Sequence, residues 1–205
     1  MPKMIDLFSG LGGASQAFVD AGWQVLRIEN NPLLEEVPHT RLMDIYDFRD
    51  WVETTQAEYP EAFEDIELIW ASPPCHEFSL GFSAPKAIHS REHPNTPYHP
   101  NMDMLEVAVE IIEMIKPRYH IIENVRGACP HFLPIIGKYR QQFEAYFLWG
   151  NYPSFCPEPF PSKSEKDKRH SPLRANIKGK VPIEISEALL ASIKNQKSIY
   201  EWVIE

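Results

Sequence analysis

The chain has 205 residues, of which 43% are hydrophobic, 12% aromatic and 24% charged, a composition typical of a globular protein with its own core. A net charge of −9 excludes a surface that binds nucleic acid all over, and no window approaches the ~18 apolar residues of a membrane span. The three widely spaced cysteines form neither a disulfide framework nor paired zinc knuckles, so we expect a soluble protein of the reducing cytoplasm.

The first part of the chain alternates between strand and helix patterns. Apolar runs of strand length occur at residues 4–8, 24–28, 66–71 and 119–122. A helix-compatible stretch at 14–21 follows the first run, and apolar residues recur at helical spacing over 104–115, before the last run. Alternating strands and helices indicate a parallel sheet. We therefore predict an α/β fold with a Rossmann-like, mostly parallel sheet and helices on both faces.

Two stretches depart from this pattern. Residues 81–101 contain four prolines and three histidines, and we expect a long loop there, of a length that is usually functional or disordered. The histidine spacings match no compact zinc motif, so no metal site is expected. Residues 153–180 are rich in proline, serine and lysine and are expected to be irregular, whereas an amphipathic pattern predicts a terminal helix over 183–193.

Charge is unevenly distributed along the chain. Between residues 162 and 180, seven basic side chains stand against two acidic ones, so this window carries +5 and the rest of the chain −14. A polyanion would meet this window first, and we predict phosphate contacts from Lys166, Lys168, Arg169 and Lys178. The alternative, which a charge run by itself favours, is a solvated loop.

Glycines follow the first predicted strand, at positions 10, 12 and 13. They let the backbone approach a ligand closely and open a helix whose N-terminus attracts negative charge. Glu29, at the end of the second strand, is placed to bind ribose hydroxyls, and Asp44 to accept from an exocyclic amine. These residues favour a nucleoside-containing cofactor. The alternative is a tight structural turn with acidic side chains on the surface.

Cys75 and Glu123 follow the third and fourth predicted strands, so they converge with the glycine turn on one edge of the sheet. Two prolines before Cys75 hold it in one place, as suits a nucleophile, although an inert cysteine is the alternative. Glu123 suits a proton donor or hydrogen-bond partner, although an ordinary strand can also end in an acid.

Three motifs, taken in order, resemble those of cytosine-5 DNA methyltransferases. They are DLFSGLGG (Asp6 to Gly13), ASPPCHEFS (Ala71 to Ser79) and ENVRG (Glu123 to Gly127). The resemblance extends from residue 4 to about 127, after which only Val181, Pro182 and the following helix resemble a degraded last motif. It implies the class I S-adenosylmethionine-dependent methyltransferase fold. We expect one catalytic domain over 1–205, with the irregular basic segment at 153–180 in place of a target-recognition domain.

The resemblance also implies a cofactor, a nucleic-acid partner and roles for particular residues. S-adenosylmethionine would be held by Phe8, Ser9, Gly10, Leu11, Gly12, Gly13, Glu29, Asn30, Asp44, Ile45 and Pro74. Cys75 would add as thiolate to carbon 6 of cytosine, and Glu123 would hydrogen-bond the ring nitrogen and exocyclic amine. The partner would be DNA with its target base out of the stack, contacted by Ser79 and Arg126, and the loop after Cys75 would close over the base.

Three departures from the family pattern qualify this interpretation. Pro-Cys-Gln is Pro-Cys-His here, and no Gln-x-Arg-x-Arg motif is present, for which Arg126, Arg140 or Arg174 would have to substitute. Only about 80 residues follow Glu123, too few for a large target-recognition domain, so we expect the sequence specificity to be short, relaxed or supplied by a separate partner. Two alternatives stay open: a tRNA cytosine-5 methyltransferase, and a methyltransferase-like module that binds without turnover.

Overall fold

The computed structural model describes residues 1–79, 81, 84–161 and 171–196. These residues form one seven-stranded sheet in the order β3-β2-β1-β4-β5-β7-β6. The strands are β1 (Lys3–Leu7), β2 (Gln24–Glu29), β3 (Thr40–Leu42), β4 (Ile66–Ala71), β5 (Tyr119–Asn124), β6 (Gln141–Phe143) and β7 (Tyr146–Asn151). The first five are parallel, whereas β7 runs antiparallel to both β5 and β6.

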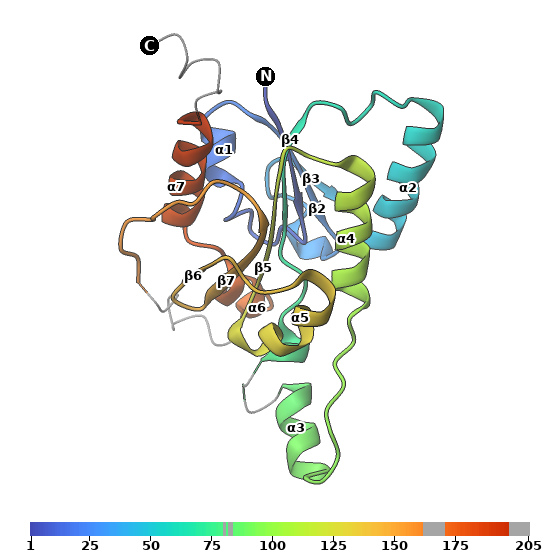
Figure 1. Cartoon of the computed structure of the whole chain (residues 1–205), viewed down its shortest axis with the longest axis vertical. Coiled ribbons are helices and arrows are strands. Elements are labelled where there is room, and N and C mark those ends of the chain that lie inside the picture. The colour runs from blue at the N-terminus through green and yellow to red at the C-terminus, as the bar shows by residue number, and fades with distance from the viewer. Residues whose placement is uncertain (80, 82–83, 162–170, 197–205) are drawn as a thin grey trace.

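Helices cover both faces of the sheet (Figure 1). They are α1 (Gln16–Asp20), α2 (Ile45–Glu58), α3 (Pro85–Glu92), α4 (Asp103–Ile115), α5 (Cys129–Ile136), α6 (Arg174–Gly179) and α7 (Ile183–Lys194). One face packs against α2 and α4, and the other against α1 and α7. The prediction of a mostly parallel sheet with helices on both faces is therefore confirmed.

Each central strand contributes to two cores. Along β4, Leu68 and Trp70 belong to the cluster under α1 and α7, whereas Ile69 and Ala71 belong to the cluster under α2 and α4. Alternate residues of a strand point to opposite faces, so a strand covered on both sides reads as a continuous apolar run. This is why β1, β2, β4 and β5 are recognisable in the sequence.

Two of the expected irregular stretches contain helices. Residues 81–101 include α3, which projects away from the body of the molecule in Figure 1 and buries none of its residues. Without a buried face the helix lacks the apolar stripe that identifies a helix in a sequence, so the expectation of a loop is wrong for 85–92. The expectation of irregular structure over 153–180 is likewise wrong for α6, which also buries no residue.

The helix and strand patterns missed five further elements, which are α2, β3, α5, β6 and β7. The long helix α2 has a mixed surface, and β3 and β6 are only three residues long. Within the described part of the chain, no helix is both long and apolar enough to cross a membrane.

Candidate functional site

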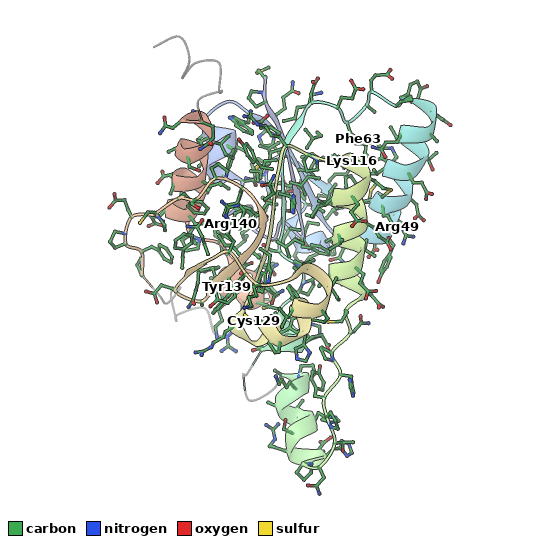
Figure 2. All side chains as sticks on the ribbon, viewed as in Figure 1. Arg49, Phe63, Lys116, Cys129, Tyr139 and Arg140 are labelled. Carbon is green, nitrogen blue, oxygen red and sulfur yellow. The ribbon has the colours of Figure 1, made fainter. Side chains whose placement is uncertain are left out.

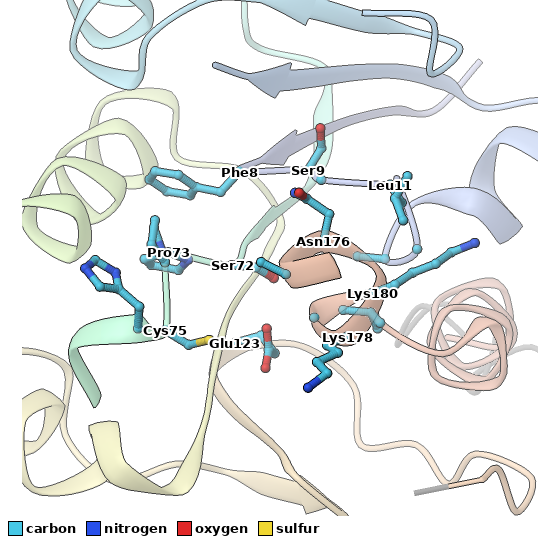
Figure 3. A pocket seen from close by; sticks show the side chains of 18 of the residues that line it. Phe8, Ser9, Leu11, Ser72, Pro73, Cys75, Glu123, Asn176, Lys178 and Lys180 are labelled. Atoms are coloured by element: carbon cyan, nitrogen blue, oxygen red, sulfur yellow. The ribbon is translucent and has the colours of Figure 1, made fainter. Parts of the chain in front are cut away.

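A cavity of about 740 Å³ opens at the carboxyl ends of the strands. Strand order reverses between β1 and β4, and ligands of open α/β sheets bind at such a switch point. The residues that follow β1, β2, β4 and β5 line the cavity together (Figure 3). These are Phe8, Ser9, Gly10, Leu11, Gly13, Glu29, Asn30, Ser72, Pro73, Pro74, Cys75 and Glu123. The volume is that of a typical site for a small molecule.

The glycine turn needs its glycines for both conformation and space. Gly10 and Gly12 have φ angles of +52° and +69°, which favour glycine. A Cβ atom on Gly12 would lie 2.4 Å from the guanidinium carbon of Arg27, and one on Gly13 would lie 2.2 Å from the carbonyl oxygen of Val181. Gly12 itself does not line the cavity. Its part in the site is the close packing beneath the turn.

A buried polar network supports the turn from below. The Ser15 hydroxyl donates to Asp6 Oδ2 at 2.5 Å, and Arg27 Nε donates to Ser15 Oγ at 2.8 Å. Arg27 also donates to the carbonyl oxygens of Pro38 and Gly12. Burial raises the pKa of Asp6 to about 7, against the opposing effects of Ser15 and Arg27. The sequence analysis missed this network, because Arg27 stands alone within an apolar strand run.

The Glu29 carboxylate joins the ends of β1 and β2. Its Oε2 accepts from the backbone N–H of Gly10 at 2.8 Å, and its Oε1 accepts from those of Asn30 and Asn31 at 3.1 and 3.0 Å. Oε2 accepts only one of these hydrogen bonds and can accept another, so the group is held in place while it still faces the cavity. The buried Ser9 hydroxyl has no hydrogen-bond partner among the described residues. An unpaired polar atom beside a fixed carboxylate fits a hydroxyl-bearing ligand such as a ribose.

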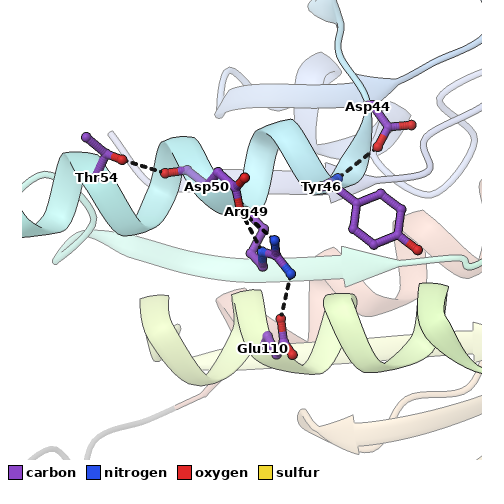
Figure 4. A network of polar contacts seen from close by, with 6 residues as sticks. All are labelled: Asp44, Tyr46, Arg49, Asp50, Thr54 and Glu110. Atoms are coloured by element: carbon purple, nitrogen blue, oxygen red, sulfur yellow. Dashed lines mark hydrogen bonds and ion pairs between the residues drawn. The ribbon is translucent and has the colours of Figure 1, made fainter.

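Asp44 has a structural contact of its own. Its side chain caps α2, where it accepts from the backbone N–H of Tyr46 at 2.9 Å (Figure 4). The neighbouring residues Met43 and Ile45 line the cavity, whereas Asp44 does not. A cap such as that of Asp44 stabilises a helix N-terminus by about 1 kcal/mol. Farther along α2, Arg49 pairs with Asp50 and with Glu110 of α4, which ties the two helices together (Figure 4).

Cys75 and Glu123 share the floor of the cavity (Figure 3). The Cys75 side chain is accessible but closely surrounded. Its partial burial raises the pKa of the thiol, and the nearby Glu123 carboxylate raises this pKa further. Glu123 is 8% exposed, and burial raises its pKa to about 7 against a hydrogen bond from Ser72. At neutral pH, the cavity therefore holds a protonated thiol next to a carboxyl group that is protonated part of the time.

Asn124 links the strand that carries Glu123 to the turn that carries Cys75. Its buried side chain donates from Nδ2 to the Pro73 carbonyl oxygen at 2.9 Å, which links the end of β5 to the turn that carries Cys75. Gly127 completes the contact, because a Cβ atom there would lie 1.9 Å from the Phe78 carbonyl oxygen. The sequence indicates Asn124 only through its position directly after Glu123.

The C-terminal segment forms the opposite wall of the cavity. Asn176, Lys178, Lys180 and Val181 all line it (Figure 3). The Asn31 amide approaches Asn176 Oδ1 at 3.5 Å, and the Tyr146 hydroxyl donates to the Lys180 carbonyl oxygen at 3.1 Å. Tyr146 also lines the cavity, and burial and the Glu123 carboxylate raise its pKa to about 12.

Some of the residues expected to contact nucleic acid line the cavity, and others lie away from it or outside the described residues. Ser79 lines the cavity and accepts from the Gly81 N–H, whereas Arg126 lies in a 3₁₀ turn (Arg126–Ala128) and does not line it. Arg140, labelled in Figure 2, stacks over the Tyr152 ring, 5.2 Å from its centroid. Lys166, Lys168 and Arg169 lie outside the described residues. Of the predicted phosphate contacts, the structure places only Lys178, and it lies at the cavity.

Histidines gather around the arm that carries α3. His89 stacks near His93 and Tyr98, and the Tyr98 hydroxyl donates to Glu77, whose other oxygen lies 3.0 Å from His76 Nε2. These contacts tie the arm to the residue two positions after Cys75. No group of three or more His, Cys, Asp and Glu residues suited to a metal ion occurs among the described residues.

Comparisons with known proteins point to one family. Residues 2–139 match the model of the C-5 cytosine-specific DNA methylases. The chain is 32% identical over 133 residues to the type II methyltransferase M.HgiGI of Herpetosiphon aurantiacus. The matched segment covers 62% of this chain and 92% of that relative.

Solved structures similar to the chain include a protein assigned as a DNA modification methyltransferase encoded within an E. coli prophage, with 18% identity and a TM-score of 0.45. Another is the SAM dependent methyltransferase of Agrobacterium tumefaciens, with 17% identity and a TM-score of 0.38. The similarity covers 73% and 61% of this chain but only 46% and 39% of theirs. The chain thus spans less than half the length of these two proteins.

Proposed function

The chain belongs to the C-5 cytosine-specific DNA methylase family, and on that premise we propose that it transfers a methyl group from S-adenosylmethionine to carbon 5 of cytosine in DNA. Its mostly parallel sheet is the class I methyltransferase fold that the motifs imply. The observation that carries the proposal is the placement of Cys75 and Glu123 on the floor of one cavity, with the pKa of Glu123 raised to about 7.

Cys75 and Glu123 divide the chemistry between them. The Cys75 thiol first loses its proton to solvent, and the resulting thiolate forms a bond to carbon 6 while the electron pair of the 5,6 double bond moves into the ring. Glu123, whose pKa is raised to about 7 by burial, donates a proton to the ring nitrogen that takes up this charge and recovers it when the ring is restored. After carbon 5 has gained its methyl group, loss of the carbon 5 proton to solvent expels the Cys75 thiolate and restores the double bond.

The cofactor would lie against the glycine turn and Glu29. S-adenosylmethionine, when bound, supplies an electrophilic methyl group. Glu29 would accept from the ribose hydroxyls, since its carboxylate is already fixed by three backbone N–H groups, and the unpaired Ser9 hydroxyl would bind beside it. Met43 and Ile45 offer an apolar surface to the adenine.

Methyl transfer from tritiated S-adenosylmethionine to DNA and, in parallel, to tRNA tests the proposed function. We expect label in DNA and none in tRNA. DNA that contains 5-fluorocytosine should trap the protein covalently, because fluorine at carbon 5 blocks the elimination that releases Cys75. Label in tRNA alone would assign the other substrate, and label in neither would refute methyl transfer.

The Cys75→Ser variant is the matched control for this test. Its hydroxyl is a far weaker nucleophile than a thiolate at neutral pH, so we expect transfer and trapping to be lost. Cofactor affinity should stay within about threefold, because the thiol acts on the base and the cofactor wall is built from other residues. Trapping by the Ser variant would mean that another residue is the nucleophile.

A further inference from the structure

The cavity needs a positive charge that its sheet wall does not provide. The described lining residues include three acids, Asp6, Glu29 and Glu123, whereas the lysines Lys178 and Lys180 are the lining residues with permanently cationic side chains. No arginine lines the described cavity. Both lysines come from the C-terminal wall, so this wall supplies the charge that the strand ends lack.

We propose that Lys178 is a further catalytic residue, which donates a hydrogen bond to the carbonyl oxygen of the target pyrimidine during the addition of Cys75. This role rests on the proposed function. The bond that forms is the one from sulfur to carbon 6, and the electron pair displaced from the 5,6 double bond is delocalised over carbon 5, the ring nitrogen and the carbonyl oxygen. Lys178 keeps its proton and stabilises the charge on that oxygen.

Contacts on either side of Lys178 hold its segment against the cavity. Before it, Asn176 meets Asn31 and lies 3.7 Å from where a Cβ on Gly10 would be. After it, the Lys180 carbonyl accepts from Tyr146, and the buried Val181 packs on Gly13. Because the backbone is anchored on both sides of Lys178, only the side chain itself has to be ordered when it reaches a substrate in the cavity.

The direction of the two lysines distinguishes their roles. In Figure 3, Lys178 extends on the side of the cavity where Cys75 and Glu123 lie, whereas Lys180 extends toward the glycine turn and away from them. Neighbouring neutral donors already have partners in the protein: the Tyr146 hydroxyl donates to Lys180, and the Ser72 hydroxyl bonds to Glu123. The exposed ammonium of Lys178 has no hydrogen-bond or ion-pair partner among the described residues, so it can donate to a base that enters beside Cys75.

Single-turnover methyl transfer to DNA at saturating cofactor tests this role. Lys178→Met should slow transfer and 5-fluorocytosine trapping by about 100-fold, as loss of one preorganised donor to a developing oxyanion does. Lys178→Arg should restore most of the rate, because it keeps a cationic donor. Lys180→Met removes the same charge from the same segment and should lower the rate only a few-fold. Lys194→Met, at the end of α7, is the control for lysine loss elsewhere.

A phosphate contact is the rival role for Lys178, and salt dependence separates the two. A phosphate contact would leave the saturated rate unchanged and reduce the slope of log affinity against log salt by about 0.9, and that result would overturn the proposal. An equal loss in Lys178→Met and Lys180→Met would also overturn it, since only net charge would then matter. If the parent protein methylates no DNA, it is the proposed function that fails.

Discussion

The two walls of the cavity are built in opposite ways. The sheet wall consists of the strand ends with Asp6, Glu29, Cys75 and Glu123, whose buried acids each have a partner on a neighbouring strand or turn. The C-terminal wall consists of α6 and residues 180–181; α6 buries no residue and is held by two side-chain hydrogen bonds and by Val181.

The difference shows which wall can change without loss of the fold. Substitutions in the sheet wall disturb both chemistry and packing, because the same side chains do both. Substitutions in α6 should alter catalysis or substrate choice while the fold stays intact, since its exposed side chains contribute little buried surface.

The largest effect after loss of Cys75 is expected from Glu123→Gln in the sheet wall. We expect the rate of methyl transfer to fall about 100- to 1,000-fold, because an amide cannot pass a proton to the ring nitrogen. The pKa of Glu123 is about 7, so the parent enzyme loses the protonated carboxyl as the pH rises through 7. The profile of kcat/KM against pH should show this decline in the parent and not in the variant. An unchanged profile would remove Glu123 from the proton transfer.

Arg27→Leu tests the buried network under the glycine turn. Removing one partner of a buried pair leaves Asp6 uncompensated, and we expect the free energy of unfolding to drop by about 3 kcal/mol at neutral pH. Because Arg27 lowers the pKa of Asp6 against the larger effect of burial, its loss should raise that pKa further. The carboxyl is protonated and harmless below its ordinary pKa, and the free-energy cost of burying it grows as the pH rises toward the folded-state pKa, which is about 7 in the parent. The difference between variant and parent should therefore shrink in acid.

Arg118→Leu provides the matched control in the same denaturation series. Arg118 pairs with Glu67 at 3.0 Å, but 59% of its side chain is exposed. An exposed pair of this kind should contribute less than about 1 kcal/mol and show little pH dependence near neutrality. Equal losses in the two variants would mean that burial of Arg27 does not matter.

Glu29→Ala should weaken binding of S-adenosylmethionine by about 1–3 kcal/mol, the usual effect of leaving a polar partner unsatisfied. Isothermal calorimetry measures this directly. The exposed Glu36, a few residues further on, is the control, and Glu36→Ala should leave the affinity unchanged. An unaltered affinity in Glu29→Ala would show that the carboxylate serves only the backbone of the turn.

The smallest effect is expected from the part of the basic window, residues 162–180, that precedes the C-terminal wall. Alanine at Lys166, Lys168 and Arg169 should reduce the slope of log affinity against log salt by up to about 0.9 for each phosphate group that the protein no longer neutralises. Affinity should fall almost equally for all DNA sequences, because phosphate contacts carry no sequence information. The saturated rate should not change, which separates this window from Lys178. An unchanged slope would support the alternative of a solvated loop.

The sequence by itself was enough for the sheet wall and its place in the fold. The central parallel strands are apolar on both faces, so their runs are continuous and easy to recognise. The carboxyl ends of parallel strands meet at one edge of the sheet. The sequence therefore predicts that the glycine turn, Glu29, Cys75 and Glu123 lie close together, and all of them line the cavity. Their chemical character then followed from residue types at known strand ends.

Only the tertiary structure decided the other wall and the support beneath the turn. Contacts such as Val181 on Gly13 and Tyr146 on Lys180 join residues far apart in the chain, and no periodic pattern encodes them. In the sequence, Arg27 is a single charged residue within an apolar run. Only the structure shows that its guanidinium donates hydrogen bonds to Ser15 and to the Gly12 carbonyl oxygen. The α6 helix has no buried face to leave an apolar stripe, so folding alone brings Lys178 to the cavity that holds Cys75 and Glu123.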